Sequence, residues 1–183
     1  MSVSANTLFH FTQFDTLKSI IKTSGFWAKY SLENFYTSIP KSSDYNCTYI
    51  PMVCFCDLKL TQLSNTSISK HTKYFGGYGI GFNKTWGIKN NISPVSYIHN
   101  NSIAFSTISG IISQINTDNN DYSEQLIIEL GEVVKFLKPY QGYHQKGKKK
   151  SGLITYYDER EWRYIPKSKG IKHFPKTLNH LSI

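Results

Sequence analysis

Acidic residues are scarce in this sequence: 12 Asp and Glu stand against 21 Lys and Arg, which gives a formal net charge of +9. Cysteine is also scarce, and because the three cysteines cannot all pair with one another, we expect a reducing compartment. No apolar run is long enough to span a membrane, and the first residues lack the basic and apolar segments of a secretion signal. These absences predict a cytoplasmic protein with no membrane partner. The charge favours polyanionic partners, such as a nucleic-acid target or a nucleotide.

Hydrophobic and aromatic residues make up 39% and 15% of the chain, which indicates a folded protein. A length of 183 residues fits a single domain over residues 1–183 with a substantial core. Thirteen tyrosines and eleven phenylalanines favour strands, because aromatic rings suit a half-buried pleated surface. The lysines are scattered except at KGKKK, Lys146 to Lys150, which we interpret as a solvated basic loop rather than a specific nucleic-acid contact.

The amino-terminal part has the clearest periodicities. Leu8 to Thr12 alternate as in a strand, and Gln13 to Thr23 carry apolar residues on one helical face. Thr12 or Asp15 is placed to cap the start of this helix, and Gly25 to end it. The sequence therefore predicts a strand followed by an early amphipathic helix.

The rest of the chain consists of shorter segments separated by polar or glycine-rich stretches. Residues 25–37 are predicted as a loop or short helix, and residues 41–47 as a loop. Strands are predicted at residues 52–55, 94–99 and 160–166 and, after a glycine turn, within residues 76–82. Residues 102–115 are predicted as a helix, and residues 123–140 as a helix pair or a helix and a strand. With no repeat and no second domain, these segments predict an α+β fold with a mixed or antiparallel sheet.

Five segments occur in order along the chain: LFHFTQFDTLKSIIKTSGF, YIPMVCFCDL, YFGGYGIGFNKTWGI, PVSYI and YYDEREWRYIP. Together they resemble the AbiGi family of bacterial abortive-infection proteins, which act in phage defence. The resemblance covers nearly the whole chain. It implies one component of a two-gene system, with a cognate toxin or antitoxin protein as its partner.

A second, weaker resemblance concerns mechanism. The HFT strand, the helix after it and a late Glu that opens a strand look like ADP-ribosyltransferases, in particular the DNA-modifying toxins. This resemblance implies split, twisted sheets that grip NAD as a substrate. It matches His10 and Thr12 to the position that holds the cofactor's ribose, and Glu161 to the late Glu. The candidate cofactor-binding residues are His10, Phe11, Thr12, Tyr74 and Tyr78.

The chemistry of this reaction suits the same residue types. Breaking the bond to nicotinamide builds positive charge on the ribose, which a nearby carboxylate stabilises. A neutral histidine can donate to a ribose hydroxyl, and aromatic faces hold a planar ring. We therefore predict that Glu161 and His10 are catalytic and that Glu159 assists, for example by activating an acceptor.

A structural role is the alternative for His10. If Phe9 and Phe11 face the core, alternation turns His10 to the opposite face of the sheet. A histidine that is hydrogen-bonded to the backbone would then explain the residue without catalysis.

The two glutamates also have a structural alternative. If the late strand begins at Asp158, Glu159 and Glu161 share a face, because residues two apart point the same way. The alternative to catalysis is then a ladder of surface charge with Arg160 and Arg163, which contributes little to stability.

Cys54 and Cys56 would point the same way on a strand, with His71 and Cys47 as conceivable additional metal ligands. The tight ligand pairs of a structural zinc site are missing, so buried thiols are the better interpretation and no metal is expected. The glycines of GGYGIGF match no phosphate-binding loop, and turn and strand packing explains them.

The leading functional hypothesis is an ADP-ribosyltransferase-like toxin that transfers ADP-ribose from NAD to a nucleic acid or a protein. The competing class is a non-enzymatic antitoxin that binds its partner, with His10 and Glu161 in structural roles. A plain RNA-binding module is the third possibility.

Overall fold

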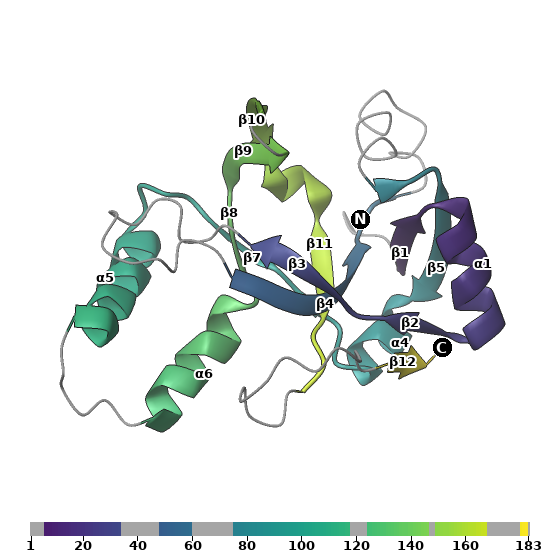
Figure 1. Ribbon diagram of the computed structural model, residues 1–183, viewed down its shortest axis with the longest axis horizontal. Helices are drawn as coiled ribbons and strands as arrows, with labels where there is room; N and C mark the ends of the chain where they lie inside the picture. Colours follow the sequence, from purple (N-terminus) through teal and green to yellow (C-terminus); the bar gives the residue numbers. More distant parts are fainter. Residues whose placement is uncertain are drawn as a thin grey trace. The chain divides into compact units, whose positions relative to one another are not determined.

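The computed structural model describes residues 6–33, 48–59, 75–117, 124–146, 149–167 and 180–182 (Figure 1). The chain divides into two compact units. The first unit draws on Met1–Ser31, Pro51–Pro94 and Glu159–Ile183, and the second on Leu32–Ile50 and Val95–Asp158. Each unit thus combines segments that are far apart in the sequence. The prediction of one domain over residues 1–183 stays a prediction.

One sheet organises the first unit. Its strand order is β5–β1–β4–β11–β6, with antiparallel pairs, and β3 also pairs with β4. The strands are β1 (Thr7–Thr12), β3 (Lys29–Glu33), β4 (Thr48–Cys56), β5 (Tyr78–Asn83), β6 (Ser93–Pro94) and β11 (Glu161–Tyr164). The end of β3, from Leu32, and the start of β4, up to Ile50, are assigned to the second unit. The predicted strands at residues 8–12, 52–55 and 160–166 are confirmed, as is the strand that follows the glycine turn.

The early helix is confirmed as α1 (Phe14–Thr23), but its caps differ from the predicted ones. Gln13 is the N-cap residue and makes no side-chain capping bond, because Thr12 ends β1 and Asp15 pairs with Lys18 at 2.7 Å within the first turn. At the other end, Ser24 takes the left-handed conformation with φ of 50°, and its backbone N–H donates to the carbonyls of the last turn. The chain then enters β2 (Gly25–Trp27) directly.

The prediction of a loop or short helix at residues 25–37 is wrong over the described part, because residues 25–27 form β2 and residues 29–33 form β3. β2 pairs with β12 (His180–Ser182), near the other end of the chain, in a register that sets Trp27 opposite His180. Sequence reasoning also missed α4 (Lys84–Lys89), which Asn83 caps by accepting from the Thr85 N–H at 2.8 Å.

The core of the first unit lies on one face of the main sheet. Half-buried aromatic residues of β5, α4 and β11 pack against a cluster of buried side chains. The buried members are Leu8, Ile20, Phe26, Ala28, Val53, Phe55 and Ile92. This cluster joins α1 and β2 to the central strands, so burial of apolar surface fixes which face of β1, β4 and β11 points inward.

The second unit combines two helices with short strands. Its elements are β7 (Ser96–Ile98), α5 (Ile103–Thr117), α6 (Glu124–Val134), β8 (Leu137–Pro139), β9 (Gln141–Lys146), β10 (Lys149–Thr155) and the 3-10 helix η2 (Tyr156–Glu159), whose last residue is assigned to the first unit. β7 and β8 pair in parallel, and β9 and β10 form an antiparallel hairpin. Phe105, Val134 and Leu137 form a second buried cluster. The predicted helix at residues 102–115 and the short strand at 94–99 are confirmed, and residues 123–140 supply a helix and a strand.

The predicted fold class is confirmed at the level of an α+β protein whose sheets are mostly antiparallel. The described helices include none that is both long and apolar enough to cross a bilayer. The predicted loop at residues 41–47 lies outside the described residues.

Candidate functional site

The three central strands bring the predicted site residues onto one sheet, and the register assigns each side chain to a face. Phe9 of β1 lies opposite Cys56 of β4, and Cys56 in turn lies opposite Glu161 of β11. The next row pairs Phe55 with Trp162. Because directly opposed residues share a face, Phe9, Cys56 and Glu161 lie on one face, while Phe55 and Trp162 lie on the other, against the core.

His10 lies on the core face of the sheet. Its ring packs edge-on against Phe26 with centroids 4.9 Å apart and lies 5.7 Å from the ring of Phe55. The condition considered above, that Phe9 and Phe11 face the core, is not met for this core: Leu8 is the buried neighbour, and His10 shares its side of β1. His10 therefore has the surroundings of a core histidine.

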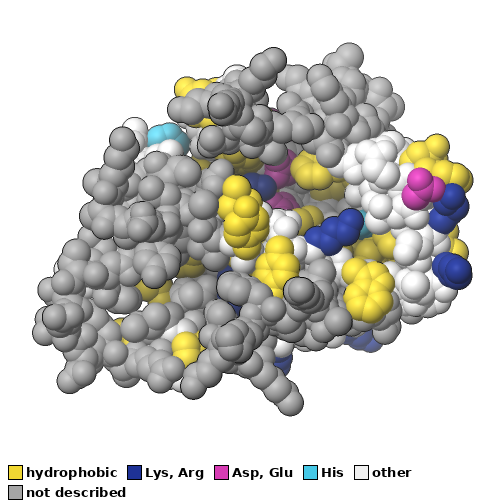
Figure 2. All heavy atoms as spheres, viewed as in Figure 1, with side chains coloured by type: hydrophobic (Ala, Val, Ile, Leu, Met, Phe, Trp, Pro, Cys, Tyr) yellow, Lys and Arg dark blue, Asp and Glu magenta, His cyan; other side chains and the backbone are white. Residues whose placement is uncertain are grey.

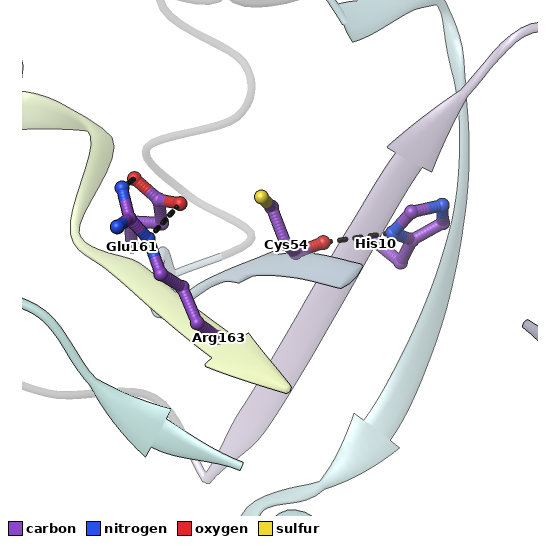
Figure 3. A network of polar contacts seen from close by, with 4 residues as sticks. All are labelled: His10, Cys54, Glu161 and Arg163. Atoms are coloured by element: carbon purple, nitrogen blue, oxygen red, sulfur yellow. Dashed lines mark hydrogen bonds and ion pairs between the residues drawn. The ribbon is translucent and has the colours of Figure 1, made fainter. Parts of the chain in front are cut away.

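Hydrogen bonding fixes the form of the His10 imidazole. Nδ1 lies 2.7 Å from the carbonyl oxygen of Cys54, and since a carbonyl only accepts, Nδ1 carries the proton and donates (Figure 3). Burial lowers the pKa of His10 below its usual value of 6.5; the bond to Cys54 opposes this shift and Lys29 adds to it. A neutral imidazole has one N–H, and here that N–H is used by the backbone of β4.

Glu161 and Arg163 form a buried ion pair on the opposite face. Arg163 donates from Nε to Oε1 of Glu161 at 2.7 Å and from Nη2 to Oε2 at 3.1 Å, so the contact is bidentate (Figure 3). Arg163 is fully buried and Glu161 is only 6% exposed. The predicted alternative of a surface charge ladder is therefore wrong, because both charges lie inside the unit and neutralise each other there.

Glu159 does not share a strand face with Glu161. The residues from Tyr156 to Glu159 form η2, and Arg160 has a φ of 44°, so the strand begins at Glu161 and not at Asp158. The carbonyl of Arg160 accepts from the Asp57 N–H at 3.0 Å, which ties this turn to the end of β4. The left-handed residue breaks the alternation on which the shared face depended.

Three of the remaining candidate cofactor-binding residues, Phe11, Thr12 and Tyr78, lie in the pairing of β1 with β5. Phe11 is half-buried and stacks on Phe9 with centroids 6.1 Å apart. These rings stand over the glycines of β5: Phe11 pairs with Gly79 and Phe9 with Gly81, where an added Cβ would lie 2.9 Å from the Phe9 ring. Strand packing thus accounts for both glycines, as predicted.

Thr12 is buried at the end of β1, opposite Tyr78 in the β1–β5 register. Tyr78 is exposed, and its ring lies 5.1 Å from that of Phe14 on α1. Tyr74 lies outside the described residues. Of the two tyrosines predicted to pack on nicotinamide, the structure therefore describes only Tyr78.

Cys54 and Cys56 carry reduced thiols and lie on the same face as Glu161 and Arg163. Burial, aided by Asp57 and Glu159, raises the pKa of the Cys56 thiol to about 12. This cysteine therefore stays protonated at neutral pH and is a poor nucleophile. Among the residues that the structure describes, no group of three or more His, Cys, Asp or Glu side chains is placed to hold a metal. Cys47 and His71 lie outside that part of the chain.

The sheet thus brings Glu161, Arg163, Cys54 and Cys56 together and separates them from His10. β4 lies between β1 and β11, and the two predicted catalytic side chains leave the sheet on opposite faces. Arg163 was missed as a site residue. Its spacing of two from Glu161 was the available signal, because residues two apart on a strand share a face.

The basic segment Lys146 to Lys150 was predicted as a loop, but Lys146 ends β9, Lys149 and Lys150 open β10, and Lys146 lies opposite Lys149. Gly147 and Lys148 lie outside the described residues. On the face of the molecule in Figure 2, acidic and basic side chains lie next to one another over α1, in line with the Asp15–Lys18 pair. Hydrophobic side chains also reach the surface on that face (Figure 2).

Residues 26–180 match the family described as "Putative abortive phage resistance protein AbiGi, antitoxin". The chain belongs to the AbiGi family. It is similar to the abortive phage resistance protein AbiGi of Lactococcus lactis subsp. cremoris, with 38% identity over 128 residues, which cover 64% of this chain and 51% of that protein. The matched part of this AbiGi chain thus spans about half the length of its curated relative. No solved structure matches the chain significantly.

Proposed function

We propose that this AbiGi chain acts in abortive phage resistance as the antitoxin component of a two-protein system. It would bind a cognate toxin protein and neutralise it without catalysing a reaction itself. The observation that carries this proposal is the family match over residues 26–180, whose description names an antitoxin. The similar Lactococcus lactis protein adds a link to phage resistance.

The arrangement of the sheet supports a structural role for the two predicted catalytic residues. Both oxygens of Glu161 accept from Arg163, and the N–H of the neutral His10 ring is used by the Cys54 carbonyl. A catalytic group must reach the reacting atoms, and these two side chains leave the sheet on opposite faces. The geometry of Glu161 and His10 therefore favours a role in stabilising the fold, as expected if the chain is a non-enzymatic antitoxin.

Bacterial growth tests the proposal. The chain is expressed from an inducible promoter alone, with the gene that accompanies it, or not at all, and surviving colonies are counted. We expect no loss of colonies with the chain alone, strong loss with the accompanying gene alone, and recovery when both are expressed. Growth arrest by the chain alone would overturn the antitoxin assignment, and so would a failure to rescue cells from the accompanying protein.

An ADP-ribosyltransferase activity is the competing proposal, and one observation favours it: Glu161 opens β11, as the late Glu of that family opens a strand. Incubation with labelled NAD and cell extract tests it. Because Glu161→Gln leaves Arg163 buried without its carboxylate, loss of transfer in that variant could reflect unfolding. The control is the double variant Glu161→Gln/Arg163→Met, which lacks Glu161 but leaves no buried arginine charge. Both variants are compared at equal folded fraction. Transfer of ADP-ribose by a well-folded double variant would exclude Glu161 from catalysis.

A further inference from the structure

The edges of the main sheet differ in how well they are protected against further pairing. β6, at one end, has two residues and contains Pro94. β3, which pairs only with β4 among the described strands, carries the charged residues Lys29 and Glu33. Short length, proline and charge keep the edges of sheets from pairing with other chains. β5, at the other end, has six residues with neither a charge nor a proline, so it lacks these protections.

The outer side of β5 is accessible. Six consecutive residue pairs join β5 to β1 without a bulge. Within the part of the chain that the structure describes, no strand pairs with the other side of β5. Gly79 and Gly81 are exposed, and Tyr78 is 47% exposed. A regular strand at the open edge of a sheet is a template for the addition of one more strand.

The side chains of β5 follow almost the same order in both directions. Around Ile80 the order is aromatic, glycine, isoleucine, glycine, aromatic. A two-fold symmetric dimer uses the same patch on both copies, so that patch must be complementary to itself. An antiparallel pair of two β5 strands centred on Ile80 would set Tyr78 opposite Phe82. It would also set Gly79 opposite Gly81 and the two copies of Ile80 opposite each other.

This register keeps both faces of the sheet continuous. Directly opposed residues share a face in an antiparallel pair. In β5, Ile80 and Phe82 pack against the core of the unit, whereas the glycines lie on the other face, beneath aromatic rings of β1. Pairing about Ile80 therefore matches core-face residues with core-face residues. The resulting Tyr78–Phe82 pair is of the aromatic kind that stabilises adjacent strands.

The charge of the chain also favours contact between two copies at this edge. Because each copy has a net charge of +9, two copies repel each other, and surfaces without charged side chains meet at the lowest electrostatic cost. Residues 75–83 contain no Asp, Glu, Lys or Arg. Two positively charged copies can therefore approach at β5 without placing like charges opposite one another.

We propose that the chain forms a two-fold symmetric dimer in which the β5 edges of two copies pair antiparallel about Ile80. The two main sheets then form one continuous sheet, with the sheet cores of both copies on the same side of it. Backbone hydrogen bonds supply the contact, and the Tyr78–Phe82 pair, which occurs twice, fixes the register. The dimer is separate from the binding of a cognate toxin and does not depend on it.

Sedimentation velocity of the full chain over a range of micromolar concentrations tests the proposal. We expect a monomer–dimer equilibrium that strengthens when salt is raised, because salt screens the repulsion between the copies. Tyr78→Lys should weaken the dimer at least about tenfold, since both aromatic pairs are lost, whereas Tyr78→Phe should keep it. Tyr143→Lys, which makes the same change at an exposed tyrosine of β9, is the matched control and should dimerise normally.

Disulfide formation tests the register itself. In the proposed dimer, the two residues at position 80 face each other across the symmetry axis, within reach of a disulfide. The two residues at position 77 lie about 20 Å apart along the strands and cannot be joined within the dimer. With oxidised glutathione, Ile80→Cys should give several times more disulfide-linked dimer than Gly77→Cys, whose position has open space. Non-reducing electrophoresis measures both, with the parent chain as the background from its own cysteines.

Four results would overturn the proposal. These are a monomer at every concentration, a dimer that weakens as salt rises, an equal effect of Tyr78→Lys and Tyr143→Lys, and equal disulfide yields at positions 77 and 80. If the chain alone is a monomer and Tyr78→Lys abolishes rescue from the accompanying toxin, the β5 edge binds a strand of that partner and not a second copy. If circular dichroism shows that Tyr78→Lys is unfolded, the disulfide comparison decides.

Discussion

A guanidinium without access to water needs a carboxylate at close range, and Arg163 has one in Glu161. Removing one partner of a buried pair leaves a charge that neither water nor protein compensates. Replacing both partners by neutral groups removes that problem, so the two residues should behave as one unit when they are substituted.

We therefore expect Glu161→Gln and Arg163→Met each to lower the free energy of unfolding by about 3–5 kcal/mol. The double variant should lose much less than the sum of the two. Urea unfolding followed by circular dichroism measures all three. Lys18→Ala, at the exposed pair with Asp15, serves as the control and should change stability little. If the stability loss of the double variant equals the sum of the two single losses within about 0.5 kcal/mol, the two charges do not act together.

His10 gives a pH dependence with a defined sign. Its pKa in the folded chain lies below 6.5, so below that pH the unfolded chain takes up the proton first. The stability from the neutral, buried ring is therefore fully present above pH 6.5 and is lost as the pH falls toward the lower folded pKa. The loss can reach about 1.4 kcal/mol per pH unit for one group.

Unfolding of the parent chain and of His10→Gln at a series of pH values between neutral and mildly acidic checks this expectation. The parent chain should lose stability more steeply than the variant on acidification, so the difference between them shrinks. Parallel profiles for the two proteins would mean that His10 does not titrate in a buried site.

At the scale of elements, the entry into β5 depends on one glycine. Gly76 has a φ of 115°, and a Cβ built there would lie 2.1 Å from the Thr12 carbonyl oxygen. The next residue, Gly77, has open space around the same position. Of these two neighbouring glycines, Gly76 therefore has no room for a side chain and Gly77 does.

Gly76→Ala should lower the free energy of unfolding by at least about 2 kcal/mol, because both the backbone conformation and the contact with Thr12 oppose a side chain. Gly77→Ala should leave stability nearly unchanged. Thermal unfolding of both variants measures the contrast. Equal effects at the two positions would contradict the close approach of Gly76 to β1.

Local patterns predicted most of the elements correctly. Alternation gave β1, helical spacing gave α1, and the glycine turn gave β5. The caps of α1 were wrong because strand pairing already held Thr12, and β2 was missed because its partner, β12, lies at the other end of the chain. Pairing between distant segments leaves no local signal in a single sequence.

The candidate site was harder to predict than the elements for the same reason. The choice of sheet face for His10 depends on Phe26 and Phe55, which come from other strands. The face shared by Glu159 and Glu161 depended on where β11 begins, and a single left-handed residue, Arg160, moved that point. Residue types suggested chemistry, but register decided which of them meet.

At the scale of the whole molecule, the two functional proposals differ in what should stabilise the protein. A ligand that binds only the folded chain raises its melting temperature in proportion to the logarithm of its concentration. The antitoxin proposal assigns that effect to a protein partner, and the enzyme proposal assigns it to NAD.

We expect the purified cognate partner, at about 100 times its Kd, to raise the melting temperature of the chain by about 5–10 °C. NAD alone should leave it unchanged. Differential scanning fluorimetry with each ligand checks this, with an unrelated protein of similar charge as the control. A shift with NAD and none with the partner would reverse the order of the two proposals.

The pairing of Glu161 with Arg163 also constrains how this protein can change over generations. A lineage that alters one of the two positions first would pass through a poorly folded ancestor. Related chains should therefore show coordinated replacement, with an acid facing a base or two neutral residues together, and mixed combinations should be rare. Sequencing the survivors of a library randomised at both positions would reveal whether these combinations are filtered in this way.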